Sequence, residues 1–231
     1  MDRWPEFELE RLETVLVRAE LQEQRLLAAG DYQGVVNHLL RSASAACLAD
    51  REDAALGFVA RGAVRTMEWV RAARAAKTKP STFADVAFTR GWLAAAICPP
   101  PGMEEPAGHL LAMSGWQPAG QVHNARMVAA LLIGDVPAAE LSLQRCDLSD
   151  PGLGAPLKRF VSALLAGEED AMAKAANAWL REKMDATMTH EWGAYNEVPI
   201  EVSGVLALAA HHGRLLLLPG NRVLTRFRTG A

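Results

Sequence analysis

The sequence predicts an all-α protein built from irregular, repeat-like antiparallel helical hairpins (α-α), with a short extended C-terminal tail. Three observations lead to this prediction. Half of the 231 residues are hydrophobic while only 6% are aromatic, and the abundant alanine loses no side-chain entropy in a helix. Apolar residues recur at helical spacing along most of the chain. Glycine or proline interrupts these segments, and helix-capping residues often follow.

Five helices are expected in the first half of the chain, over about residues 5–29, 31–50, 51–77, 83–97 and 107–113. Pro5 suits a first helical turn because its missing N–H costs nothing there. Gly30 ends the first helix and Asp31 caps the second. The prolines at residues 99–101 stop the fourth helix. The side chains of the third helix expected to face the core are Leu56, Val59, Val64, Met67 and Val70.

Five more helices are expected over about residues 122–133, 137–145, 156–166, 168–184 and 199–213. Three helices end in the same way, at Gly30-Asp31, Gly134-Asp135 and Gly167-Glu168. In each pair the glycine can adopt a positive φ and the acid can cap the following helix. The pairs are unevenly spaced, so a regular tetratricopeptide array is not expected. Residues 215–224 are expected to be extended, as one short strand or a hairpin, because Pro219-Gly220-Asn221 is typical of a turn.

Size and cysteine content point to one helical domain over residues 1–231, although the Pro-rich loop 99–106 is a possible subdivision. The three cysteines, Cys47, Cys98 and Cys146, are far apart and lack a CxxC pair. They are expected to be free thiols in a reducing compartment. The chain begins without a signal-peptide pattern and has no apolar run that spans a bilayer. A cytoplasmic protein that does not enter a membrane is therefore expected.

Charge argues against nucleic-acid binding, because the formal net charge of −3 leaves no excess of Lys and Arg for phosphates. The charge is nonetheless segregated. Residues 168–201 hold eight acidic and three basic side chains, whereas the tail after Gly213 holds four arginines and no acid. This distribution is typical of a surface that attracts a basic partner, and equally of solvated helix faces.

Motifs for catalysis, phosphate binding or metal binding are missing from the sequence, so neither an enzyme nor a cofactor or metal site is expected. Gly34, Gly57, Gly62 and Gly204 fall inside predicted helices, which indicates close helix packing or weak helix. His211-His212 ends the last strong helix, where imidazolium complements the helix dipole. A metal role is the alternative.

The segment from Thr187 to Pro199 is polar and aromatic and lies between two strong helices, and Glu201 follows in the first turn after Pro199. Exposed Trp and Tyr with flanking acids are typical of interface anchors. The residues predicted to bind a partner are His190, Glu191, Trp192, Tyr195, Glu197 and Glu201. Two alternatives stay open. The aromatic residues plug the edge of the core, or His190 and the acids form a metal or acid–base cluster.

The chain resembles bacterial polymorphic-toxin immunity proteins, in particular immunity protein family 49. The resemblance rests on the all-helical layout and on the C-terminal third, where Glu197-Val198-Pro199 leads into the helix Val205–Gly213, an apolar segment and Pro219. It implies a non-enzymatic antitoxin that binds and neutralises a cognate secreted toxin, encoded by the adjacent gene. The other hypothesis is a helical-repeat scaffold that binds another cytoplasmic protein or a peptide. A helical enzyme that uses His190 ranks third.

Overall fold

The computed structural model describes residues 6–49, 51–76, 84–113, 122–146, 148, 153–188, 198–218 and 223–227. Within these ranges the chain is helical almost throughout, which confirms the predicted all-α fold. The helices are α1 (Glu6–Ala28), α2 (Tyr32–Leu48), α3 (Glu52–Ala75), α4 (Ala84–Ile97), α5 (Glu104–Ala112), α6 (Val122–Leu132), α7 (Val136–Arg145), α8 (Gly154–Ala166), α9 (Glu169–Met188), α10 (Val198–His211) and the 3₁₀ turn η2 (Thr225–Phe227).

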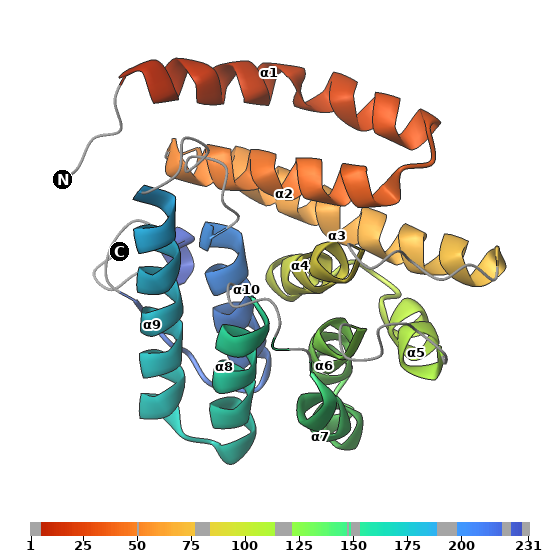
Figure 1. The fold of residues 1–231 in the computed structure, drawn as a ribbon, viewed down its shortest axis with the longest axis vertical. Coiled ribbons are helices and arrows are strands. Elements are labelled where there is room, and N and C mark those ends of the chain that lie inside the picture. The colour runs from red at the N-terminus through yellow and green to blue at the C-terminus, as the bar shows by residue number, and fades with distance from the viewer. Residues whose placement is uncertain are drawn as a thin grey trace.

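Most helices that follow each other in the chain pack against each other, and α1–α2, α2–α3, α6–α7 and α8–α9 do so as hairpins, as the sequence predicts. Figure 1 shows α1, α2 and α3 stacked across one end of the molecule, with the α8–α9 and α6–α7 hairpins below them. α4 and α10 lie in the middle, where α10 packs against α4, α9, α2 and α6. Buried apolar side chains from α1 to η2 form one continuous core.

The hairpin turns use the predicted glycine–acid pairs. Gly30, Gly134 and Gly167 have φ values of 69°, 77° and 72°, in the left-handed region that glycine enters without a Cβ clash. Asp31 and Asp135 then accept hydrogen bonds from the backbone N–H groups of the third residue after each of them. These caps confirm the prediction at Gly30-Asp31 and Gly134-Asp135, and the positive φ of Gly167 confirms the turn after α8.

α4 and α10 are buried on nearly all sides, as expected for helices that are apolar around their whole circumference. Glycine lets the central helices approach one another. A Cβ at Gly62 in α3 would lie 3.0 Å from the Leu40 side chain in α2, and one at Gly204 would lie 2.9 Å from the Leu93 backbone oxygen in α4. The predicted close packing at Gly62 and Gly204 is therefore confirmed. Gly91 of α4 makes a similar close approach to Thr66 of α3.

Three details differ from the sequence predictions. Val64 was expected to face the core but is 40% exposed, because it lies on the outer side of α3. α5 begins at Glu104 rather than near residue 107, so the end of the Pro-rich loop is helical. α9 continues to Met188, four residues beyond the predicted end.

Residues 214–218 after α10 are not helical, in agreement with the predicted extended tail, and the 3₁₀ turn η2 follows at Thr225–Phe227. Leu216 and Leu218 are buried, and the Leu218 N–H donates a hydrogen bond of 2.7 Å to the Phe227 carbonyl. The chain therefore returns on itself and places η2 against the core. The predicted Pro219-Gly220-Asn221 turn lies outside the described residues.

Candidate functional site

The predicted partner-binding segment is described only at its end. His190, Glu191, Trp192, Tyr195 and Glu197 lie outside the described residues, so their role stays a prediction. Glu201 lies in the first turn of α10. It is only 1% exposed, which places its carboxylate inside the protein and not on an acidic surface.

The Glu201 carboxylate faces Arg90 of α4. The Arg90 Nε donates to Glu201 Oε1 over 2.7 Å, and both side chains are largely buried. A carboxylate removed from water needs such a charged partner. The expectation that Glu201 belongs to an exposed partner surface is corrected on this point, because the residue joins α4 to α10 instead.

Histidines at helix ends bond to backbone carbonyls of neighbouring helices. His211 Nε2 lies 3.0 Å from the Ala96 oxygen in the last turn of α4. His212 Nε2 lies 3.1 Å from the Leu131 oxygen in the last turn of α6. Carbonyls in a last helical turn have no partner within their own helix. The two rings therefore join the end of α10 to two other helix ends, which is a structural role.

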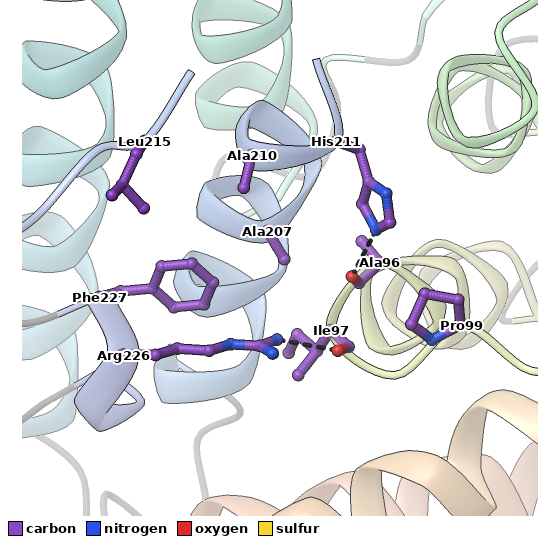
Figure 2. Close-up of a pocket in the computed structure, with 9 residues that line it drawn as sticks. All are labelled: Ala96, Ile97, Pro99, Ala207, Ala210, His211, Leu215, Arg226 and Phe227. Carbon is purple, nitrogen blue, oxygen red and sulfur yellow. Dashed lines mark hydrogen bonds between the residues drawn. The ribbon is translucent and has the colours of Figure 1, made fainter. Parts of the chain in front are cut away.

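A pocket of about 390 Å³ lies where α4, α10 and η2 meet (Figure 2). The lining is mostly apolar: Ala96, Ile97, Pro99, Ala207, Ala210, His211, Leu215, Arg226 and Phe227. The Arg226 guanidinium spans one side, donates to the Ile97 carbonyl over 2.8 Å and lies 4.9 Å from the centroid of the Phe227 ring. Arg226 and His211 thus already bond to the last two carbonyls of α4, which gives both polar groups of the pocket a role in the fold.

Cys98 directly follows α4 beside this pocket. Burial raises the pKa of its thiol, and the nearby Arg226 charge lowers it by a smaller amount. A thiol with a raised pKa is a weak nucleophile at neutral pH. This cysteine therefore lacks the thiolate character of a catalytic residue. Cys47 is buried and forms no disulfide in the described part of the chain.

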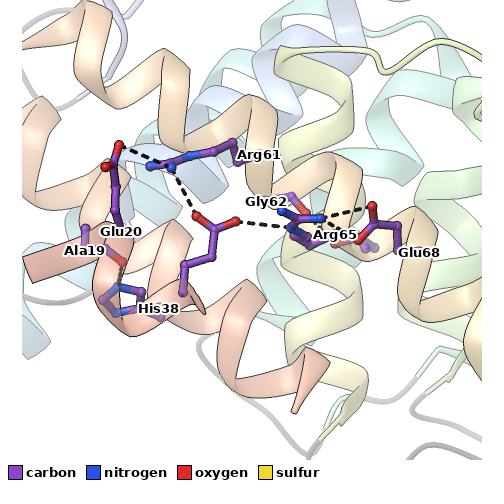
Figure 3. A network of polar contacts seen from close by, with 9 residues as sticks. Ala19, Glu20, His38, Arg61, Gly62, Arg65 and Glu68 are labelled. Atoms are coloured by element: carbon purple, nitrogen blue, oxygen red, sulfur yellow. Dashed lines mark hydrogen bonds and ion pairs between the residues drawn. The ribbon is translucent and has the colours of Figure 1, made fainter. Parts of the chain in front are cut away.

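A buried carboxylate and two arginines join α1 to α3 (Figure 3). Glu23 is 5% exposed and lies 3.1 Å from both Arg61 Nη1 and Arg65 Nε. Arg65 also binds both oxygens of Glu68. One turn before Glu23 in α1, the Ala19 carbonyl lies 3.0 Å from His38 Nε2 of α2. α1 is thus fixed to its neighbours by polar contacts as well as by apolar packing.

The outer face of α1 carries two large apolar side chains. Val17 is 83% and Leu21 is 53% exposed, and their i,i+4 spacing places them on the same side of the helix. This side is opposite to the buried Ala19 and Glu23. Sequence analysis did not single out this face, because apolar residues in an amphipathic helix ordinarily indicate the buried side.

Within the described ranges, no three His, Cys, Asp or Glu side chains lie close enough to hold a metal ion. The same residues include no helix long and apolar enough to cross a bilayer. Comparison with known proteins finds no match for this chain among family models, curated proteins or solved structures.

Proposed function

We propose that this chain is a non-enzymatic protein-binding module, and specifically an immunity protein that neutralises a cognate toxin. The observation that carries the binding role is the exposed apolar face of α1, formed by Val17 and Leu21. Large aliphatic side chains exposed side by side on a helix lose contact with water when a partner covers them. The antitoxin role comes from the resemblance to polymorphic-toxin immunity proteins.

Several polar groups of the described chain have a structural role. His38, His211 and His212 bond to backbone carbonyls, and Glu23 and Glu201 pair with arginines. These contacts hold the helices together, and those of Glu23 and His38 keep α1 in place.

Rigid attachment of α1 matters for affinity. A helix that is already ordered loses little conformational freedom when a partner binds it. The Glu23 contacts to α3 and the His38 contact to α2 supply this order before binding. The partner surface expected from this geometry is apolar at its centre, where it meets Val17 and Leu21.

The test is co-expression with the product of the adjacent upstream gene, followed by pull-down and a growth assay. A neighbour that stops growth alone, and is bound and neutralised by this chain, supports the antitoxin proposal. A harmless neighbour, or one that does not bind, contradicts it and favours the general scaffold hypothesis.

Two substitutions on α1 that add the same negative charge test whether its outer face is the binding surface. Leu21→Glu places a carboxylate on the apolar face, and Gln22→Glu adds the same charge at an exposed position on another side of the helix. Leu21→Glu should weaken the complex by more than about tenfold, because desolvating a charge costs over 1.4 kcal/mol. Gln22→Glu should leave the affinity within about twofold. Equal affinities for both variants would remove α1 from the interface.

The segment at residues 190–197 is tested separately. Glu191→Lys and Glu197→Lys should weaken the same complex by more than about tenfold if the acids meet a basic partner. Glu201→Lys is unsuitable for this purpose, because a lysine there would face the buried Arg90 and destabilise the fold. Unchanged affinity in both variants would exclude the acidic segment.

A further inference from the structure

Three basic side chains meet where α5, α6 and α7 come together. α6 and α7 form an antiparallel hairpin, so Arg145 in the last turn of α7 lies beside His123 and Arg126 at the start of α6. The last turn of α5 also reaches this place, because Arg126 Nε donates to the Leu110 carbonyl over 3.1 Å. We call His123, Arg126 and Arg145 the α6 basic cluster.

Two nitrogen atoms of this cluster are buried without a hydrogen-bond partner in the described part of the chain. They are Arg126 Nη2 and His123 Nδ1, and His123 as a whole is only 7% exposed. A buried donor without an acceptor is costly, and a charged donor more so. Proteins rarely keep such groups unless a ligand or another group satisfies them.

The charges in the cluster repel one another. The pKa of His123 is lowered by burial and then by the charges of Arg126 and Arg145. The pKa of Arg126 is lowered by burial and by Arg145. No ion pair between described residues involves any of the three. Among the described residues, the cluster therefore has positive charge and no paired carboxylate.

The position of the cluster at a helix start increases this imbalance. The first turn of α6 carries no acid, as is also the case in α2, α7 and α8, whereas the first turns of α3, α5, α9 and α10 do. Acids stabilise a helix N-terminus and cations destabilise it, since the aligned peptide dipoles place positive charge there. α6 therefore has two reasons to attract an anion, its basic side chains and its own N-terminal end.

We propose that the α6 basic cluster binds a phosphate group, either free or carried on a small phosphomonoester. Guanidinium groups match phosphate oxygens in geometry, and a dianion neutralises both Arg126 and Arg145. A bound phosphate oxygen also accepts a hydrogen bond from the buried Arg126 Nη2. The proposal is independent of the antitoxin role, because its residues lie far along the chain from α1.

The first experiment measures binding of inorganic phosphate to the full chain by calorimetry and by thermal unfolding, against sodium chloride at equal ionic strength. Phosphate at roughly 100 times its Kd should raise Tm by about 5 °C or more. Sodium acetate serves as the carboxylate comparison and glycerol 2-phosphate as the phosphomonoester. Tighter binding of the ester supports an organic phosphate ligand, and tighter binding of inorganic phosphate supports the free anion.

The variants separate specific binding from general charge. Arg145→Gln removes an exposed arginine and should weaken phosphate binding at least about tenfold. Arg159→Gln is the matched control, because Arg159 is an exposed arginine on α8 that pairs with Glu182. It should bind phosphate as the wild type does. Equal phosphate affinity in the two variants would overturn the proposal, as would equal stabilisation by phosphate, acetate and chloride.

NMR titration of the histidine ring gives a readout specific to the cluster. Phosphate should raise the pKa of His123, because a nearby anion favours the imidazolium form. The His123→Gln variant assigns its signal among the six histidines. A His123 pKa that is the same with and without saturating phosphate would place the anion elsewhere and overturn the proposal.

Discussion

Replacing Gly204 with alanine tests how closely α4 and α10 approach each other. A Cβ at this position would lie 2.6 Å from the Leu93 Cβ and 2.9 Å from the Leu93 carbonyl oxygen. Rotation of a side chain does not relieve these contacts, because both atoms are fixed by the α4 backbone. The two central helices must therefore move apart, and the surrounding core loses contact with them.

The expected change in the free energy of unfolding of Gly204→Ala is the sum of two opposing contributions. Alanine favours the helical state over glycine by about 1 kcal/mol. Forcing an extra methyl group into a packed core costs about 1–3 kcal/mol. At Gly204 the contact is with backbone, so the cost falls at the upper end and the net loss is about 2 kcal/mol. For a chain of this size that loss lowers Tm by roughly 4–8 °C.

Gly57→Ala is the matched control. Gly57 is an exposed residue within α3, and a Cβ there meets no atom within 4 Å. This variant gains the helix propensity without the clash, so its stability should rise by about 1 kcal/mol. Urea unfolding followed by circular dichroism at the helix band measures both variants. Gly204→Ala as stable as the wild type would show that α4 and α10 are not in this close contact.

Three further predictions concern buried polar groups. Glu23→Ala should lower the free energy of unfolding by about 1–3 kcal/mol. Glu20→Ala removes an exposed carboxylate on the same helix and should lower it by less than about 0.5 kcal/mol. Urea unfolding midpoints compare the two variants, and equal losses would contradict the Glu23 contacts. Arg90→Met should lower the free energy of unfolding by about 3–5 kcal/mol, because it leaves the Glu201 carboxylate buried without that cation. In the same assay, the double variant Arg90→Met with Glu201→Leu should recover much of this stability. No recovery in the double variant would contradict the pairing. The lowered pKa of His123 means that the unfolded chain binds its proton more readily, so this residue contributes stability above its ordinary pKa of 6.5 that is lost as the pH falls through the lowered value. His123→Gln should flatten the fall in Tm as the pH drops below about 6.5, and an unchanged pH profile would refute this contribution.

Local chemistry allowed much of the fold to be predicted. The turns at Gly30 and Gly134, with Asp31 and Asp135 as caps, involve residues only a few positions apart. Helix ends of this kind depend on backbone conformation and on the nearest N–H groups, both of which the sequence specifies directly. Helix starts were less certain where no capping side chain marks them, as at Glu104, because Met103 caps α5 without a side-chain hydrogen bond.

The candidate sites were harder to predict because they depend on contacts between distant residues. Glu201 was assigned to a surface on the basis of its neighbours in the chain, yet its partner Arg90 is 111 residues away. The α6 basic cluster was missed for the same reason, since Arg126 and Arg145 come together only when α6 and α7 form a hairpin. In the sequence, the histidine and the two arginines of this cluster form no recognisable motif.

By itself, the amino-acid sequence determined that this protein is helical and where most of its helices end, including the turns at glycine. These properties follow from helix propensity, capping and glycine's lack of a side chain. Only the tertiary structure decided which faces are buried. It turned Glu201 inward and left Val17 and Leu21 exposed on α1, because burial depends on which helix packs against which, and residues far apart in the chain set that packing.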